Sequence, residues 1–165
     1  MGSEMCIRDS IKSKNIVCIA PDVGGTERAR ALGKILNVGL AIVDKRRPKP
    51  GQSQVMNVIG DVKDMTCIIV DDIIDSGGTI INAAKALKER GAKEVYVYIT
   101  HGVLSGDAVK KIKNSVIKNL VITDTIDNGE KVKIAKNIEV LPISGLMGEA
   151  IKRISNSTSV SDLFK

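Results

Sequence analysis

Aromatic residues are almost absent from this 165-residue sequence: they make up 2% of it, and tryptophan does not occur. Proteins that bind single-stranded nucleic acids stack the bases on aromatic side chains, so a net charge of +6 does not by itself indicate such a function here. The densest basic run, Lys45 to Lys49, lies in a segment that we predict to be a loop. We therefore expect an anionic small molecule, not a nucleic acid, as the partner.

Long hydrophobic runs are also lacking. No apolar stretch approaches the ~20 residues that span a bilayer, and the first residues show no basic segment followed by an apolar one, so we expect neither a membrane protein nor a secreted one. The three cysteines, Cys6, Cys18 and Cys67, do not have the spacing of a metal site. Because Cys18 and Cys67 lie in apolar runs, we interpret them as reduced core residues of a cytoplasmic protein.

Short apolar runs alternate with glycine-containing turns and helical patterns along the chain. This alternation predicts one α/β domain with a mainly parallel sheet of five or six strands, flanked by helices. The apolar, strand-like runs are 15–20, 40–43, 55–60, 67–70, 94–100, 120–123 and 138–141. Helices are predicted at 26–36, 80–90, 105–112 and 144–155, with Thr26 and Ser144 as N-caps and Gly91 after the second helix. Residues 1–10 continue none of these patterns, and we expect them to be a non-native leader or artefact.

One stretch, Cys67 to Thr79, places polar residues directly after a buried strand. It reads CIIVDDIIDSGGT, and an alanine-rich helical pattern follows it. Its candidate site residues are Asp71, Asp72, Asp75, Ser76, Gly77, Gly78 and Thr79. Ligands of open α/β sheets bind beyond the carboxyl ends of the strands. There the glycine turn and the first N–H groups of the helix can bind a phosphate, and the two hydroxyls add donors.

The carboxylates of this stretch indicate what else the ligand carries. A phosphate needs no carboxylate, whereas Asp71 and Asp72 can accept both hydrogen bonds of a vicinal diol. The stretch therefore predicts a sugar-phosphate site. The alternative is an acidic turn that only caps the helix, and three carboxylates beside Gly-Gly-Thr make it the weaker interpretation.

Two further segments precede this stretch. The run NIVCIA ends at Pro21, and the turn Asp22-Val23-Gly24-Gly25 leads into a helix. Taken alone, Asp22 could equally cap the turn or bind a metal. The segment 44–54, DKRRPKPGQSQ, is basic and contains prolines. Loops of this kind are usually solvated, and the residues alone favour that interpretation.

Three motifs, PDVGGTERAR, DKRRP and DDIIDSGGT, occur in this order. Together they resemble the ribose-phosphate pyrophosphokinases, over residues 11–165, and imply the type I phosphoribosyltransferase-like fold. By this resemblance, 75–79 hold the 5-phosphate of ribose 5-phosphate, and Asp71 and Asp72 hold its hydroxyls. The resemblance also implies a pyrophosphate loop and a catalytic loop. The residues that it assigns to them are Asp22, Gly24 and Gly25, with Asp22 as the Mg²⁺ ligand, and Lys45 and Arg47 as catalytic residues.

The implied reaction transfers the pyrophosphoryl group of Mg-ATP to ribose 5-phosphate, which gives phosphoribosyl pyrophosphate and AMP. The family has two similar domains and forms homo-oligomers, and residues 11–165 resemble only the second domain. We therefore expect the first domain to be missing and the chain to be inactive alone. A non-catalytic ribose-phosphate-binding fragment and a phosphoribosyltransferase remain as alternatives. The only histidine, His101, follows a strand, and we favour a structural hydrogen bond over a catalytic role.

Overall fold

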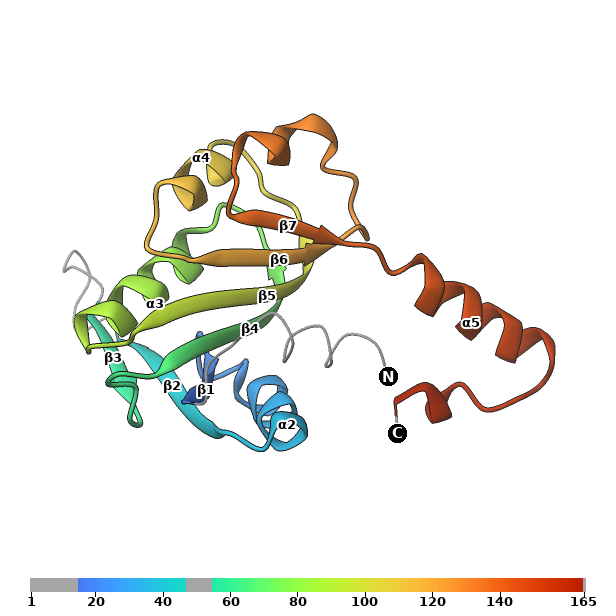
Figure 1. Ribbon diagram of the computed structural model, residues 1–165, viewed down its shortest axis with the longest axis horizontal. Helices are drawn as coiled ribbons and strands as arrows, with labels where there is room; N and C mark the ends of the chain where they lie inside the picture. Colours follow the sequence, from blue (N-terminus) through green and yellow to red (C-terminus); the bar gives the residue numbers. More distant parts are fainter. Residues whose placement is uncertain (1–14, 47–54, 165) are drawn as a thin grey trace.

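The computed structural model describes residues 15–46 and 55–164, and in them seven strands form a single sheet (Figure 1). Their order across the sheet is β3-β2-β1-β4-β5-β6-β7. Every neighbouring pair is parallel except β2 and β3, which are antiparallel. The strands are β1 (Ile16–Ala20), β2 (Gly39–Arg46), β3 (Val55–Ile59), β4 (Thr66–Ile74), β5 (Glu94–Gly102), β6 (Asn119–Thr123) and β7 (Ile138–Leu141).

The predicted α/β fold with a mainly parallel sheet is confirmed, but the expected number of strands was too low. All seven apolar runs join the same sheet, because the outermost runs pair with their neighbours in regular register as the central ones do. The run 67–70 belongs to β4, an interior strand between β1 and β5, as its β-branched, fully apolar sequence indicates.

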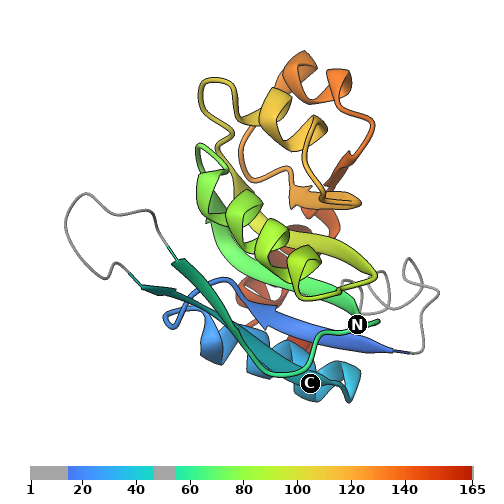
Figure 2. The same cartoon turned by 90° about the vertical axis from the view of Figure 1, so that its left-hand side faces the viewer.

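Helices cover the two faces of the sheet unequally (Figures 1 and 2). The helices are α2 (Thr26–Leu36), α3 (Gly78–Glu89), α4 (Ala108–Lys113) and α5 (Ser144–Ser155), with 3-10 helices η1 (Gly129–Ile134) and η2 (Ser161–Phe164). Helices α3 and α4 and the η1 segment contribute to the larger core on one face. Helix α2 covers part of the opposite face, where Leu36 packs with Cys18 and Ile68.

Strands β1 and β4 contribute side chains to the cores on both faces of the sheet. Cys18 belongs to the α2 side, and Cys67 belongs to the α3 side, because successive strand residues point to opposite faces. Both thiols are free and completely buried. Burial raises the pKa of Cys18 to about 11 and that of Cys67 to about 12, so these cysteines are core residues, as predicted.

Helix ends differ from the sequence prediction in detail. Thr26 and Ser144 are the first residues of α2 and α5, and the N-cap positions belong to Gly25 and Ile143, neither of which makes a side-chain cap hydrogen bond within the described chain. The Thr26 hydroxyl instead donates to the carbonyl of Val23, at 2.8 Å. Helix α3 ends at Glu89 with Arg90 as its C-cap, and Gly91 follows with φ at +89°, a left-handed conformation that favours glycine. Helix α4 begins at Ala108, three residues later than expected.

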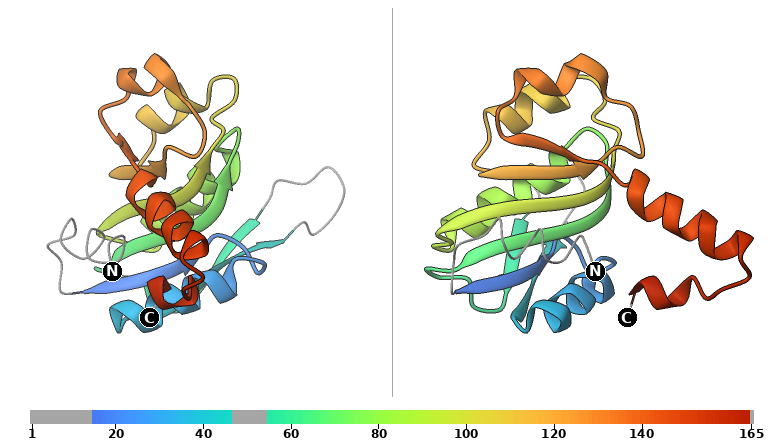
Figure 3. Two further views of the ribbon diagram at one scale, coloured as in Figure 1. Left: turned by 90° about the vertical axis from the view of Figure 1, so that its right-hand side faces the viewer. Right: turned by 45° about the vertical axis from the view of Figure 1, so that its right-hand side comes forward.

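Helix α5 projects away from the sheet (Figure 3). None of its residues is buried in the described chain, and its apolar side chains are exposed. They are Leu146, Met147, Ile151 and Ile154. In the described ranges, no helix combines the length and the apolarity needed to cross a membrane.

Candidate active site

The carboxyl edge of the parallel strands brings together the predicted site residues whose positions the structure describes. Asp22 follows β1, Lys45 lies near the end of β2, and the segment 71–79 includes the end of β4 and the start of α3. Because these strands are parallel to one another, their carboxyl ends meet at one edge. The other predicted catalytic residue, Arg47, lies outside the described residues.

Lys45 lies in a strand, which corrects the expectation that the segment 44–54 is a loop throughout. Its backbone pairs with Met56 in the antiparallel β2–β3 ladder, which extends to Arg46 and Val55. The last pair between β1 and β2 joins Ala20 and Ile42, so Lys45 is three residues further along, about 10 Å at the usual strand rise. The strand was predicted to end at Val43, and its extension through Arg46 was missed because residues 44–46 are charged and lack an apolar pattern.

The turn between β4 and α3 has the conformation expected for an anion site. Gly77 is the N-cap of α3 with φ at +77° and makes no side-chain cap hydrogen bond in the described structure. It is buried, whereas Ser76, Gly78 and Thr79 are exposed, and the first turn of α3 contains no acidic residue. The first N–H groups of a helix carry partial positive charge, and here no side chain from the described residues caps them.

The loop that follows β5 is hydrogen-bonded to the β4–α3 turn through backbone groups. The carbonyl of Ile74 accepts hydrogen bonds from the N–H groups of Val103 and Leu104, at 2.9 and 3.2 Å, and Ser105 N–H donates to the carbonyl of Asp75 at 3.2 Å. Leu104 is buried with φ at +52°, an uncommon conformation for a non-glycine residue. No local motif predicts these hydrogen bonds, because they join residues that are about thirty positions apart along the chain.

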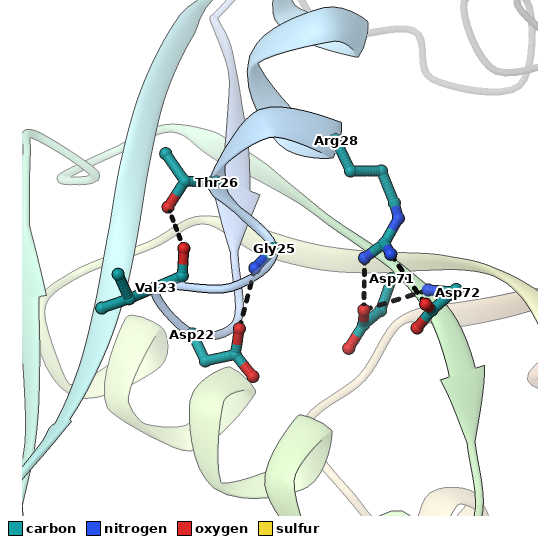
Figure 4. A network of polar contacts seen from close by, with 7 residues as sticks. All are labelled: Asp22, Val23, Gly25, Thr26, Arg28, Asp71 and Asp72. Carbon is teal, nitrogen blue, oxygen red and sulfur yellow. Dashed lines mark hydrogen bonds and ion pairs between the residues drawn. The ribbon is translucent and has the colours of Figure 1, made fainter.

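The two carboxylates at the end of β4 bind one arginine (Figure 4). Arg28 of α2 donates from Nη1 to Oδ1 of Asp71, at 2.6 Å, and from Nη2 to Oδ2 of Asp72, at 2.8 Å. The backbone N–H of Asp72 also donates to Oδ1 of Asp71, at 3.0 Å. Sequence analysis missed Arg28, although it lies within the motif PDVGGTERAR; the signal was a cation in the first turn of the helix that follows a neighbouring strand.

Burial and the arginine act oppositely on the two carboxyl groups. Desolvation raises the pKa of Asp71 above its usual value, and the attraction of Arg28 offsets this only in part. Desolvation is also the largest single effect on Asp72 and raises its pKa, but the attraction of Arg28 and the hydrogen bonds to the carboxylate together outweigh it, so the pKa of Asp72 is lowered. The side chain of Asp71 is 19% exposed and that of Asp72 57%, which explains why burial dominates only for Asp71.

Asp22 caps its own turn (Figure 4). Its Oδ1 accepts a hydrogen bond from the N–H of Gly25, at 2.9 Å, and a Cβ at Gly24 would lie 3.3 Å from the same oxygen. The described residues contain no group of three or more His, Cys, Asp or Glu that could hold a metal. A single carboxylate suits Mg²⁺, which takes one or two carboxylates and completes its shell with phosphate oxygens and water.

His101 has a local partner at the same edge. Its Nδ1 lies 2.9 Å from Oγ1 of Thr125, which in turn donates to the carbonyl of Thr100 at 3.2 Å. These contacts link the ends of β5 and β6. They agree with the structural interpretation of the histidine that the sequence favoured.

The mainly parallel sheet and the acidic, glycine-containing turn at the end of its central strand β4 define the structural class of the protein. The chain has the type I phosphoribosyltransferase-like α/β fold: it is similar to the phosphoribosylpyrophosphate synthetase of Mycobacterium smegmatis, with a TM-score of 0.85 and 33% identity over 93% of this chain and 49% of that one. A purine phosphoribosyltransferase from Pyrococcus horikoshii, 23% identical, shares the fold alone, with a TM-score of 0.53 over 84% of this chain and 80% of that one.

Sequence relatives identify the family within that class. The model of the phosphoribosyl synthetase-associated domain matches residues 44–165. The ribose-phosphate pyrophosphokinase of Hyphomonas neptunium is 57% identical over 159 residues, which is 96% of this chain and 51% of that protein. The one from Buchnera aphidicola is 50% identical over 167 residues, 99% and 53% of the two proteins. The chain therefore belongs to the phosphoribosyl synthetase family, and it spans about half the length of the curated relatives that it matches.

Proposed function

We propose that the chain is the ribose 5-phosphate-binding half of a ribose-phosphate diphosphokinase. One observation carries this proposal: the uncapped first turn of α3 and the Asp71–Asp72 pair lie at the end of the same strand. A phosphate and a sugar diol on one ligand need these two kinds of groups side by side. The high identity to named pyrophosphokinases supports the choice of reaction.

Each residue of the β4–α3 segment then has a separate task. The backbone N–H groups of 75–79 and the hydroxyls of Ser76 and Thr79 bind the 5-phosphate. Asp71 and Asp72 accept hydrogen bonds from the ribose 2- and 3-hydroxyls, which orients the anomeric hydroxyl toward the β-phosphorus of ATP. The barrier falls mainly because the two reactants are positioned, an effect that can supply roughly 7–11 kcal/mol.

The remaining residues balance the charge of the phosphates. Asp22, with Gly24 and Gly25, would hold Mg²⁺ and the pyrophosphoryl group, and the metal would neutralise phosphate charge when bound. Lys45 and Arg47 would stabilise the negative charge that develops as AMP leaves. Oδ1 of Asp22 accepts the N–H of Gly25, so its second carboxylate oxygen, Oδ2, would be the one that binds the metal.

The rest of the enzyme belongs to the same proposal. The chain spans about half of its relatives, and we infer that residues 11–165 are a carboxyl-terminal domain and that another domain supplies much of the site for the adenine of ATP. The complete enzyme would act in the cytoplasm as a homo-oligomer, in nucleotide biosynthesis. The chain alone should then bind ribose 5-phosphate and fail to form phosphoribosyl pyrophosphate.

Calorimetric titration with ribose 5-phosphate tests the site. Asp71→Ala and Asp72→Ala should each weaken binding by about 10- to 100-fold, because each removes a hydrogen bond to a charged group worth about 1.5–3 kcal/mol. Glu89→Gln removes one negative charge from the opposite end of α3, where its side chain is exposed, and should leave the affinity unchanged. AMP release from Mg-ATP should be undetectable with the chain alone. Absent binding to a folded sample would refute the site assignment, and rapid turnover would refute the need for a second domain.

A further inference from the structure

Arg28 reaches the two aspartates across a gap that the sheet leaves open. The β1–β4 ladder ends where Ile19 pairs with Ile69, but β4 continues to Ile74. Along its last residues, β4 therefore has no strand partner on the β1 side in the described structure. The guanidinium of Arg28, from the first turn of α2, lies against Asp71 and Asp72 in this place (Figure 4).

Arg28 binds two side chains that would point to opposite faces in a regular strand. Asp71 and Asp72 are successive residues, and successive strand side chains point to opposite faces. One planar guanidinium nevertheless binds an oxygen of each carboxylate, at 2.6 and 2.8 Å. The fixed fork of arginine can hold two acceptors in one geometry, which the single ammonium of lysine cannot do.

We propose that Arg28 is a positioning residue that holds the Asp71 and Asp72 carboxylates together, ionised and oriented, for the vicinal diol of the sugar phosphate. This inference rests on the proposed function. It makes Arg28 a specificity determinant for the sugar hydroxyls, distinct from the residues that bind the phosphate.

Charge explains why the pair needs this residue. Two adjacent carboxylates repel each other, and in such pairs one tends to hold a proton. A protonated carboxyl donates one hydrogen bond and loses part of its capacity to accept. Among the described residues, the charged groups that act on Asp71 are Arg28 from α2 and Asp72 from its own strand, and its neighbour on β5 is the uncharged Ile99. Arg28 is thus the cation that keeps both groups as acceptors.

The test compares two probes, ribose 5-phosphate and 2-deoxyribose 5-phosphate, which carry the same phosphate but differ in one hydroxyl. The ratio of their dissociation constants measures recognition of the diol. The wild-type chain should prefer ribose 5-phosphate by about 10-fold or more, the value of one hydrogen bond to a charged group. Arg28→Met should reduce this preference to less than about threefold. Arg28→Lys should give an intermediate ratio, because it keeps the charge without the fork.

Arg30→Met is the matched control, because Arg30 lies on the same helix with an exposed side chain. It removes the same charge and should keep the wild-type ratio. A general loss of attraction for a dianion weakens both probes alike and leaves the ratio unchanged, so only a diol-specific role changes it. The preference of Arg28→Met should also fall further as the solution is acidified, since losing the cation raises the pKa of both carboxyl groups.

Each outcome decides between the two proposals. A wild-type ratio in Arg28→Met, together with a lost preference in Asp71→Ala, would overturn the role of Arg28 and leave the sugar-phosphate site intact. No preference in the wild-type chain would overturn both. Thermal unfolding of each variant checks the fold, and if Arg28→Met does not fold, a wild-type ratio in Arg28→Lys overturns the inference while a reduced one supports it.

Discussion

The β1–α2 turn and the β4–α3 turn consist of the same elements, but among the described residues a side chain occupies only the first of them. In the first, the carboxylate of Asp22 accepts the N–H of Gly25, and Glu27 adds an acidic side chain in the first turn of α2. In the second, Gly77 adopts the left-handed conformation, and no acidic side chain lies in the first turn of α3. The first turn resembles an anion site that its own carboxylate fills, whereas the second is open to an external anion.

This difference indicates separate requirements for the ligands of the two turns. A phosphate can approach the β4–α3 turn directly. At the β1–α2 turn it would meet the negative charge of Asp22, unless a cation lies between them. The two turns are also connected, because Arg28 of α2 binds the carboxylates that precede the β4–α3 turn. A change in one turn can therefore reach the other through a single side chain.

The largest expected effect comes from glycine substitutions. Gly77→Ala forces a residue with a Cβ into φ +77°, which should lower the free energy of unfolding by about 1–2 kcal/mol and weaken ribose 5-phosphate binding. Gly24 has no positive φ, and its added Cβ would press only on Oδ1 of Asp22, at 3.3 Å, so Gly24→Ala should stay within about 1 kcal/mol of the wild type. Urea unfolding and calorimetry measure both quantities. Equal losses in the two variants would mean that the left-handed turn is not what distinguishes the β4–α3 site.

Much of this contrast was readable from the sequence. The buried run of β4, the Gly-Gly-Thr turn and the parallel sheet follow from β-branched residues, glycine and the alternation of elements, all of which are local signals. The positions of Asp22 and of 71–79 at one edge also follow, because parallel strands end together. The two strand–turn–helix units could therefore be predicted without coordinates.

The cross-connections could not be predicted in the same way. The contacts of Arg28 join residues more than forty positions apart, and whether Asp22 caps the turn depends on the conformation of Gly25. The extension of β2 through Lys45 depends on pairing with β3, since basic residues have weak strand preference. Such features arise from tertiary packing, which a pattern of neighbouring residues does not record.

A smaller effect is expected from the charge at the β1–α2 turn. Asp22→Asn keeps an oxygen that can accept the N–H of Gly25, so stability should change by less than about 1 kcal/mol. Removing the charge should strengthen binding of metal-free pyrophosphate and weaken its Mg²⁺-dependent binding, because the metal loses its carboxylate ligand. Calorimetry with and without Mg²⁺ separates the two effects. Weaker binding under both conditions would show that Asp22 does not repel the anion.

The smallest difference between the two units is expected in the reactivity of their buried cysteines, which lie in the strands that precede the turns. Cys18 in β1 and Cys67 in β4 are completely buried on adjacent strands of one sheet. Because burial raises their pKa values to about 11 and about 12, the folded chain holds both thiol protons tightly. The stability that this contributes is complete below the ordinary thiol pKa of 9.0 and is lost as the pH rises through these raised values. At about pH 8 only an opened chain should therefore react with iodoacetamide.

In a Cys6→Ser background, the two thiols should be alkylated at the same rate, because one cooperative sheet exposes both when it unfolds. Mass spectrometry of the labelled peptides measures each rate, and mild urea should accelerate both equally. Faster labelling of Cys18 would show that the β1–α2 unit opens by itself. The contrast between the turns would then reflect a difference in local stability as well as in charge. Equal labelling rates would mean that the two units differ only in their turn residues. In one turn the carboxylate of Asp22 accepts a backbone N–H, and in the other Gly77 makes no side-chain cap hydrogen bond within the described chain.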